Sequence, residues 1–382
     1  MADSANISLS ALRDGQQARV AALHLSGGMR RRVAIPALIR LRGSAGADRG
    51  TFSTASTLSA DGGELSVKGR FNPREQSYDA AIRADSFPLN SFLPADSLGI
   101  VDLTLQARGT GFDPLLPRTR TSLRAQIDRA EFGGRDFGGI ELDAELDSQR
   151  LSGRISDRDE ALRLLLSVSG TLTEREQRIG LSGSVFGFDL AALGVSPEPI
   201  SGSFALDASA SAAGKGAYAA RIALDSIEIR NKHRTDRIRP TSVSLHTDSA
   251  ATRAEAASGD LSLTFSTPQS ADSLIAALTR SARTLAGQID AQSIDMEQLK
   301  PALPDFALRV SAGPDNILNS LLKSRKIAFD ALNAEGANCD SLPVSIRLRT
   351  EGLAYGNVVL DTVTADIRQN GKRLEYALGL AN

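Results

Sequence analysis

The chain has 382 residues, and its 44 basic and 45 acidic side chains give a formal net charge of −1 at pH 7. A compact chain of this length normally divides into about two or three domains. Charges of both signs are interleaved and no basic run stands out, so nucleic acid is not expected as a partner. Aromatic residues make up only 4 % and tryptophan is absent, which leaves little material for base stacking or for sugar-binding platforms.

A single cysteine, Cys339, excludes an internal disulfide framework. The sequence has no apolar run of about eighteen residues, the length that suggests a transmembrane helix, and no secretory signal peptide. Residues 1–10 already alternate as a β-strand does. We therefore expect the sequence to be an internal piece of a longer protein, or one that lacks its targeting segment.

The first 83 residues predict a meander of short antiparallel strands. Turns are expected at Gly27-Gly28, at 43–46, at Asp61-Gly62-Gly63 and at Asn72-Pro73. Glycine and asparagine tolerate positive φ there, and proline lacks a backbone donor. The alternating apolar residues of the expected strands are Ile7/Leu9, Val20/Ala22, Leu23/Leu25, Val33/Ile35, Ile39/Leu41, Leu65/Val67 and Tyr78/Ala80/Ile82.

Residues 84–114 combine a short apolar hook with an alternating strand. The hook consists of Phe87, Leu89 and Phe92 and is closed by Pro94. The strand that follows has its apolar side chains at Leu103, Leu105 and Ala107. Strict alternation of this kind predicts a strand with one apolar face and one solvated face.

The hook and the strand recur twice, at intervals of roughly 100 residues. The matching positions are Phe188, Leu190, Leu193, Phe204, Leu206 and Ala208, then Ile294, Met296, Leu299, Phe306, Leu308 and Val310. Prolines separate hook from strand each time, at Pro94, at Pro197 and Pro199, and at Pro301 and Pro304. Such a period predicts one stacked, elongated β-repeat region over residues 1–382, with approximate units 1–83, 84–186, 187–292 and 293–382. Chance similarity between alternating strands is the alternative.

Further alternating segments follow between and after these repeats. They contain Ile127, Ile140/Leu142/Ala144/Leu146, Leu151, Ile155, Leu162/Leu164/Leu166/Val168, Ile179/Leu181/Val185, Ile222/Leu224, Ile227/Ile229, Val243/Leu245, Leu261/Leu263/Phe265, Ile327/Phe329, Val344/Ile346/Leu348, Val358/Leu360, Val363/Ala365/Ile367 and Tyr376/Leu378/Leu380. The run 164–166 is also compatible with a strand buried on both faces. The phase changes between Leu224 and Ile227, which indicates a β-bulge or an ordinary turn.

Two segments depart from the two-residue period and predict short amphipathic helices. In 272–286, one helical stripe is formed by Leu274, Ile275, Leu278, Ala282 and Leu285. Asp272 can cap its start. The second helix is expected over 315–326, with basic residues in its last turn that complement the helix dipole. In total we expect on the order of twenty-five strands and two helices.

No residue pattern predicts an enzyme, a metal site or a cofactor. His24, His233 and His246 are not at ligand spacing from one another or from Cys339. The glycine pairs at 109–111 and 214–216 lack phosphate-loop and dinucleotide spacing, and no serine lies in a Gly-x-Ser-x-Gly elbow. The carboxylates of 157–160 lie in a charged turn without a partner histidine, so a solvated turn explains them.

Two helices cannot cover the apolar faces of some two dozen strands. These faces must meet each other in a sandwich or a closed barrel, or line a groove that holds an apolar ligand. A smooth aliphatic wall suits acyl chains, which carry no polar groups to satisfy. The candidate groove residues are Leu103, Leu105, Leu142, Leu162, Leu164, Leu166, Phe204, Leu206, Leu261, Leu263, Phe265, Val344 and Ile346. An ordinary sandwich core is the alternative account of the same residues.

A family resemblance begins at residues 84–114, whose sequence is ADSFPLNSFLPADSLGIVDLTLQARGTGFDP. This segment resembles the C-terminal region of the TamB-like proteins, the translocation and assembly module of the Gram-negative envelope, within the wider AsmA-like group. Supporting segments are GGIELDAELDSQRLSGRISDRDEALRLLLSVSGTL at 138–172 and LKPALPDFALRVSAGPDNILNSLLKSRKIAFDAL at 299–332. The resemblance spans most of residues 84–368 and rests on patterns of apolar residues.

The resemblance implies an elongated, twisted antiparallel β-sheet folded along its length into a hydrophobic groove, a β-taco, that spans the periplasm. It also implies phospholipid transport between the two membranes, a role in outer-membrane biogenesis and protein insertion, and an Omp85-type barrel as partner. The full-length protein is expected to be anchored in the inner membrane by an N-terminal segment that this sequence lacks. A structural β-repeat spacer or a surface adhesin, with a closed core and no lipid, is the alternative.

Overall fold

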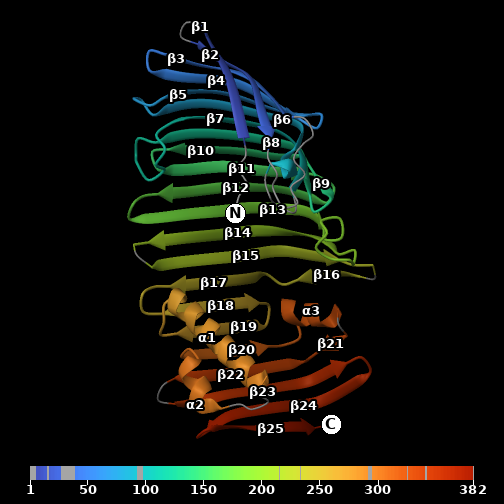
Figure 1. The fold of residues 1–382 in the computed structure, drawn as a ribbon. Helices are drawn as coiled ribbons and strands as arrows, with labels where there is room; N and C mark the ends of the chain where they lie inside the picture. The colour runs from blue at the N-terminus through green and yellow to red at the C-terminus, as the bar shows by residue number, and fades with distance from the viewer. Residues whose placement is uncertain are drawn as a thin grey trace. The chain divides into compact units, whose positions relative to one another are not determined.

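A computed structural model describes residues 6–14, 17–26, 39–92, 98–214, 216–232, 234–290, 295–324, 326–339 and 342–381 (Figure 1). These residues form 25 β-strands, three α-helices and two short 3₁₀ helices. The predicted all-β fold class with antiparallel strands is confirmed. Several residues used in the predictions lie outside the described part, namely Gly27-Gly28, Val33/Ile35, Pro94, Lys215, His233, Ile294 and Arg325.

The chain divides into two compact units, one of residues 1–174 with 183–199 and one of residues 175–182 with 200–382. The strands of the first unit are β1 (Asn6–Asp14), β2 (Gln17–Ser26), β3 (Ile39–Asp48), β4 (Thr51–Ala60), β5 (Gly63–Asn72), β6 (Ser77–Pro88), β7 (Leu98–Thr110), β8 (Arg120–Phe132), β9 (Arg135–Phe137), β10 (Ile140–Asp147), β11 (Arg150–Arg158) and β12 (Leu162–Leu172). Strand β13 (Glu176–Asp189) contributes residues to both units. A 3₁₀ helix, η1 (Leu89–Ser91), follows β6.

The second unit adds short helices to its strands. Its strands are β14 (Ser201–Ala213), β15 (Ala217–Arg230), β16 (Thr235–Ile238), β17 (Thr241–Thr247), β18 (Thr252–Ser258), β19 (Leu261–Thr267), β20 (Phe306–Ala312), β21 (Ile327–Ala328), β22 (Ala331–Cys339), β23 (Leu342–Tyr355), β24 (Val358–Asn370) and β25 (Arg373–Ala381). Its helices are α1 (Ala271–Asp290), α2 (Met296–Leu299), η2 (Lys300–Ala302) and α3 (Ile317–Ser324).

Within each unit, neighbouring strands pair antiparallel and mostly in chain order, as a meander does (Figure 1). Short strands interrupt the order. β10 lies beside β8, with β9 as a short partner at the end of β8. In the second unit β17 pairs with β15 and β22 pairs with β20. The repeat units predicted from the sequence stay a prediction.

The register of the first unit places apolar side chains opposite each other from strand to strand. One cross-strand row contains Leu41, Leu58, Leu65, Ala84, Leu103, Ile127 and Ile140. The next row contains Val67, Ile82, Leu105, Ala125, Leu142, Ile155 and Leu166. Because a strand has a two-residue period, the polar residues between these positions lie on the opposite face.

The apolar hook predicted at 87–92 is a local core. Phe87 is 2 % exposed and packs with Ala60, Ala84 and Val101. Its ring stacks on that of Phe92, with 5.1 Å between the ring centroids. A β-bulge at the end of β6 turns the chain into this cluster. The third hook is buried in the same way, because two of its residues in α2 pack against β23, as the next subsection describes.

The two predicted helices are present as α1 and α3. Helix α1 begins at residue 271, so its cap is not Asp272. Instead the hydroxyl of Ser270 accepts a hydrogen bond from the backbone N–H of Ser273 at 3.4 Å. Helix α2 has only four residues, which is too short to produce a recognisable helical pattern.

Two ambiguities of the sequence are resolved by the strand register. The phase change before Ile227 is a β-bulge, since Ser203 lies opposite Glu228 and Ala205 opposite Asp225. The run 164–166 is buried on one face only, with Leu166 7 % exposed and its neighbour Leu165 39 % exposed.

Candidate apolar binding face

Two continuous apolar rows cross ten strands of the second unit, from β14 to β25. The first row contains Ala208, Ile222, Val243, Ala256, Leu263, Val310, Ala334, Leu348, Ala365 and Leu378. The second row contains Ala210, Ala220, Leu245, Ala254, Phe265, Leu308, Gly336, Ile346, Ile367 and Tyr376. We call these two rows the floor. No position in either row is charged.

No second layer of protein covers the floor completely. Ile222 is 48 % exposed, Val243 46 %, Leu245 41 % and Ile346 41 %. Among residues 40–381 of the described part, fifteen apolar residues are buried, fewer than one for each of the 23 strands β3–β25. Burying apolar surface is worth about 25 cal/mol per Å², so this open face is a favourable site for an apolar ligand.

The helices of the second unit contact the apolar side of the strands at their two ends. At the start of α1, the backbone N–H of Ala271 donates to Thr247 Oγ1 at 3.0 Å, and Thr252 Oγ1 donates to the carbonyl of Gln269 at 2.8 Å. By the two-residue period, both threonines lie on the same face as the floor. Figure 1 shows α1 in front of the strands β18–β20.

Helix α3 lies at the other end of the same strands, and α2 lies over β23. The backbone N–H of Ile317, the first residue of α3, donates to Ser258 Oγ at 3.1 Å. In α2, Met296 and Leu299 are buried against Val344. Ser258 and Val344 are also on the floor side by strand alternation.

The helix contacts mark the two ends of the floor on these strands. On β18, Thr252 lies at the α1 end and Ser258 at the α3 end, six residues apart. At 3.3 Å per residue this separates the two ends by about 20 Å. Between them lie only Ala254 and Ala256, the two floor residues of this strand. The floor of β17–β20 therefore runs between helices at both strand ends.

The opposite face of the strands is charged and carries ion pairs. In the first unit, Arg124 Nε lies 3.0 Å from Asp143 Oδ1 and Arg120 Nε lies 2.8 Å from the carboxylate of Asp147. In the second unit, Arg309 pairs with Glu335 at 3.2 Å. All these side chains are exposed, so each pair is worth about 0–1 kcal/mol. The two faces of the strands thus differ sharply in character.

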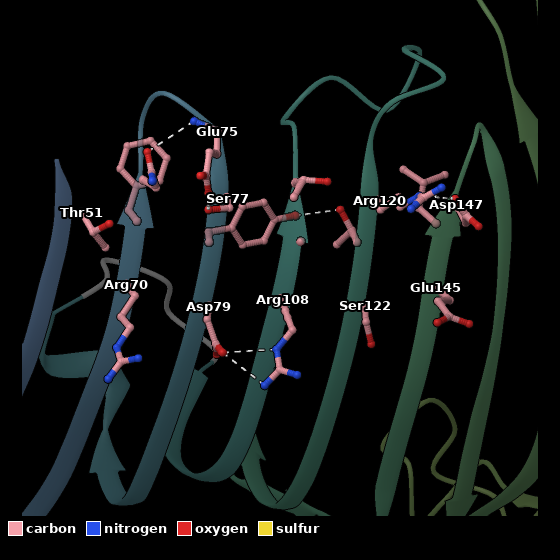
Figure 2. A pocket seen from close by; sticks show the side chains of 17 residues that line it. Thr51, Arg70, Glu75, Ser77, Asp79, Arg108, Arg120, Ser122, Glu145 and Asp147 are labelled. Carbon is pink, nitrogen blue, oxygen red and sulfur yellow. Dashed lines mark hydrogen bonds and ion pairs between the residues drawn. The ribbon is translucent and has the colours of Figure 1, made fainter. Parts of the chain in front are cut away.

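One hollow of the first unit contains part of the charged face. The hollow in Figure 2 has a volume of about 770 Å³ and is lined by Arg70, Asp79, Arg108, Ser122 and Glu145, among others. These five side chains form one cross-strand row of the polar face. The lining also includes Phe71, Tyr78 and Leu146, which lie on the other face of these strands by alternation, and the hollow contains the Arg108–Asp79 ion pair.

The thirteen candidate residues are divided between the two units. On the apolar side of the first unit lie Leu103, Leu105, Leu142, Leu162, Leu164 and Leu166. On the apolar side of the second lie Leu206, Leu261, Leu263, Phe265, Val344 and Ile346. Phe204 differs, because it is the single residue opposite the bulge of β15.

Sequence reasoning missed the small residues of the floor. Ala254, Ala256, Ala334 and Gly336 lie in the two floor rows between larger aliphatic neighbours. Only the cross-strand register shows this, because alanine alternates with polar residues in many exposed strands as well.

One titratable group interrupts the apolar face of the first unit. Asp157 is 7 % exposed and lies opposite Leu164. Burial raises the pKa of the Asp157 carboxyl, and the hydrogen bond from the backbone N–H of Asp159, at 2.8 Å, opposes this rise. The hydrogen bond is that of a tight turn at the end of β11, so Asp157 has a structural role.

Within the described residues, no group of three or more His, Cys, Asp or Glu side chains could hold a metal ion. None of the helices in this part of the chain has the length and apolar character needed to cross a bilayer. Comparisons with protein-family models, with curated proteins and with solved structures gave no match. The class of the protein therefore follows from the fold, which is an all-β chain of antiparallel strands with an open aliphatic face.

Proposed function

We propose that the apolar face binds phospholipid acyl chains and lets them move along its rows. The observation that carries this proposal is the floor, two uncharged rows that cross ten strands while several of their side chains stay exposed. A ligand that covers such rows must be apolar and extended, as an acyl chain is.

The composition of the floor favours movement over tight binding at one point. Burial of each methylene contributes about 0.8 kcal/mol. Alanine, valine, leucine and isoleucine offer an acyl chain similar contacts at each strand, and no hydrogen-bonding group fixes its position. An acyl chain therefore meets no deep trap as it passes from strand to strand.

The resemblance to TamB-like proteins extends this proposal to the whole protein. On that basis, the full-length protein is anchored in the inner membrane, lies in the periplasm and carries phospholipid toward the outer membrane. An Omp85-type barrel is its proposed partner in outer-membrane biogenesis and protein insertion. The apolar face supports the lipid-binding part of this proposal, and the resemblance alone supports the partner and the location.

The test places two charges on the floor or on the opposite face of one strand. Leu263→Asp with Phe265→Asp puts both carboxylates on the floor side of β19. Thr264→Asp with Ser266→Asp puts them on the exposed face of the same strand. A buried, unpaired carboxylate costs several kcal/mol. Only the first pair of substitutions should therefore abolish the co-purification of phospholipid that native mass spectrometry detects. In cells, only the first pair should cause a loss of envelope integrity.

Circular dichroism controls for folding, since both variants must retain the β-sheet signal of the parent. Equal lipid content in the two variants would contradict lipid binding on the floor. Complete absence of lipid from the unmodified protein would instead favour the structural spacer.

A further inference from the structure

Helix α1 is docked on its less apolar side. Its buried residues are Ala277, Ser281 and Gln288. The larger aliphatic residues Ile275 and Leu278 are 62 % and 51 % exposed. An amphipathic helix in a soluble protein normally buries its apolar stripe.

The exposed aliphatic residues form one continuous stripe of α1. We call this the α1 stripe, and it consists of Ile275, Leu278, Leu285 and Ile289. Successive residues of an α-helix are about 100° apart around its axis. The centre of the α1 stripe therefore lies about 100° around the helix from the buried residues Ala277, Ser281 and Gln288. A roll of about that angle exchanges the side that is buried.

Side-chain hydrogen bonds hold the later part of α1 in its present position. Ser281 Oγ donates to the carbonyl of Ala302 in η2 at 2.6 Å. The side chain of Gln288 exchanges two hydrogen bonds with the backbone of Asp295, at 3.0 and 3.1 Å. At the same strand end, Thr267 Oγ1 is buried without a protein partner. Each such hydrogen bond contributes only modestly to stability, because hydrogen bonds to water can replace it.

The floor offers the α1 stripe a matching surface. The helix begins where β17 ends and β18 begins. Its contact residue Thr247 follows the exposed floor residues Val243 and Leu245 on the same face of β17. Its 20 residues span about 30 Å. With strands about 4.8 Å apart, this length crosses about six of them. These correspond to the floor strands β17–β20, β22 and β23.

We propose that α1 is a cover for the floor of the second unit, which it occupies with its stripe when no acyl chain is bound. This inference rests on the proposed function, because the cover and an acyl chain compete for one surface. The floor is closed when α1 has rolled onto it and open when α1 is docked as described above. The apparent affinity for lipid then falls with the fraction of molecules whose floor is open.

The experiment is disulfide trapping in the Cys339→Ser background. The test pair is Leu278→Cys with Leu263→Cys, which joins the α1 stripe to the floor. The control pair is Arg280→Cys with Leu263→Cys, since Arg280 lies on the other side of α1. A disulfide requires Cα atoms about 4.4–6.8 Å apart. Only the test pair should therefore form a disulfide within one chain. Added oleate should suppress this disulfide, because it competes with α1 for the floor.

Equal crosslinking of both pairs, or of neither, would overturn the cover. So would a test-pair crosslink between two chains, which would identify the stripe as a self-association surface. A second variant, Leu278→Glu, should tighten the binding of a fluorescent fatty acid by up to about tenfold by keeping the floor open. Native mass spectrometry of bound phospholipid separates the two proposals. If the protein binds phospholipid but the test pair forms no crosslink that oleate suppresses, the proposed function stands and only the cover is refuted.

Discussion

Replacing Phe87 with alanine tests whether the hook at the end of β6 holds the first unit together. Phe87 is 2 % exposed and packs against Ala60, Ala84 and Val101. Two of these neighbours are alanines, whose short side chains cannot move in to fill a cavity, so we expect the full cost that is usual for such a substitution. Phe87→Ala should therefore lower the free energy of unfolding by about 3–5 kcal/mol.

Urea denaturation followed by circular dichroism measures this loss. With a slope of roughly 2–3 kcal/mol per M, the midpoint of the first unit should fall by about 1–2 M. Hydrogen exchange should lose protection in β4, β6 and β7, the strands that carry the cluster. The matched control is Phe132→Ala in the same unit, because Phe132 is 52 % exposed and should cost less than about 1 kcal/mol. Equal shifts for the two variants would refute the assignment of the hook as a core.

Two further substitutions give predictions that depend on pH. The raised pKa of Asp157 means that its carboxylate destabilises the folded state at pH values above the folded pKa, and that this cost vanishes below the unfolded pKa of about 3.9. Asp157→Asn keeps the turn hydrogen bond, so it should raise the urea midpoint at pH 7 and leave it unchanged near pH 3. For Asp260, burial raises the pKa, but hydrogen bonds from the Asn316 side chain and the Asp315 backbone outweigh it and leave the pKa lowered. Asp260→Ala should therefore reduce hydrogen-exchange protection of α3 at pH 7, with a smaller difference as the pH falls through the folded pKa; an equal effect at both pH values would contradict this reasoning.

The sequence was sufficient to predict which residues share a face of each strand. Alternation placed Leu103 and Leu105 on the apolar side, and the structure has both in cross-strand apolar rows. The periodicity also predicted α1 and α3, and the change of phase before Ile227 predicted the bulge. These features are local, because side-chain periods of 2 and 3.6 residues are set by backbone geometry alone.

Features that depend on register between strands could not be predicted. The floor exists because turns and bulges align strands such as β19 and β20, so that Leu263 lies opposite Val310. A shift of one residue in any strand would turn its apolar side chains to the charged face. The docking of α1 was equally inaccessible, since the helical period predicts the helix but not its position. The structure buries Ser281 and Gln288 and leaves Ile275 and Leu278 exposed.

The contrast between the two faces connects stability with the proposed function. On the charged face, pairs such as Arg124–Asp143 are solvated as well as paired, so exposure of that face costs little. On the other face, Ile222 and Val243 remain half exposed although they lie in uninterrupted apolar rows. A closed-core spacer gains nothing from leaving these side chains in water, because burying each would contribute about 1–2 kcal/mol. An acyl-binding surface requires them to be accessible, and a cover such as α1 limits what that exposure costs when no lipid is bound.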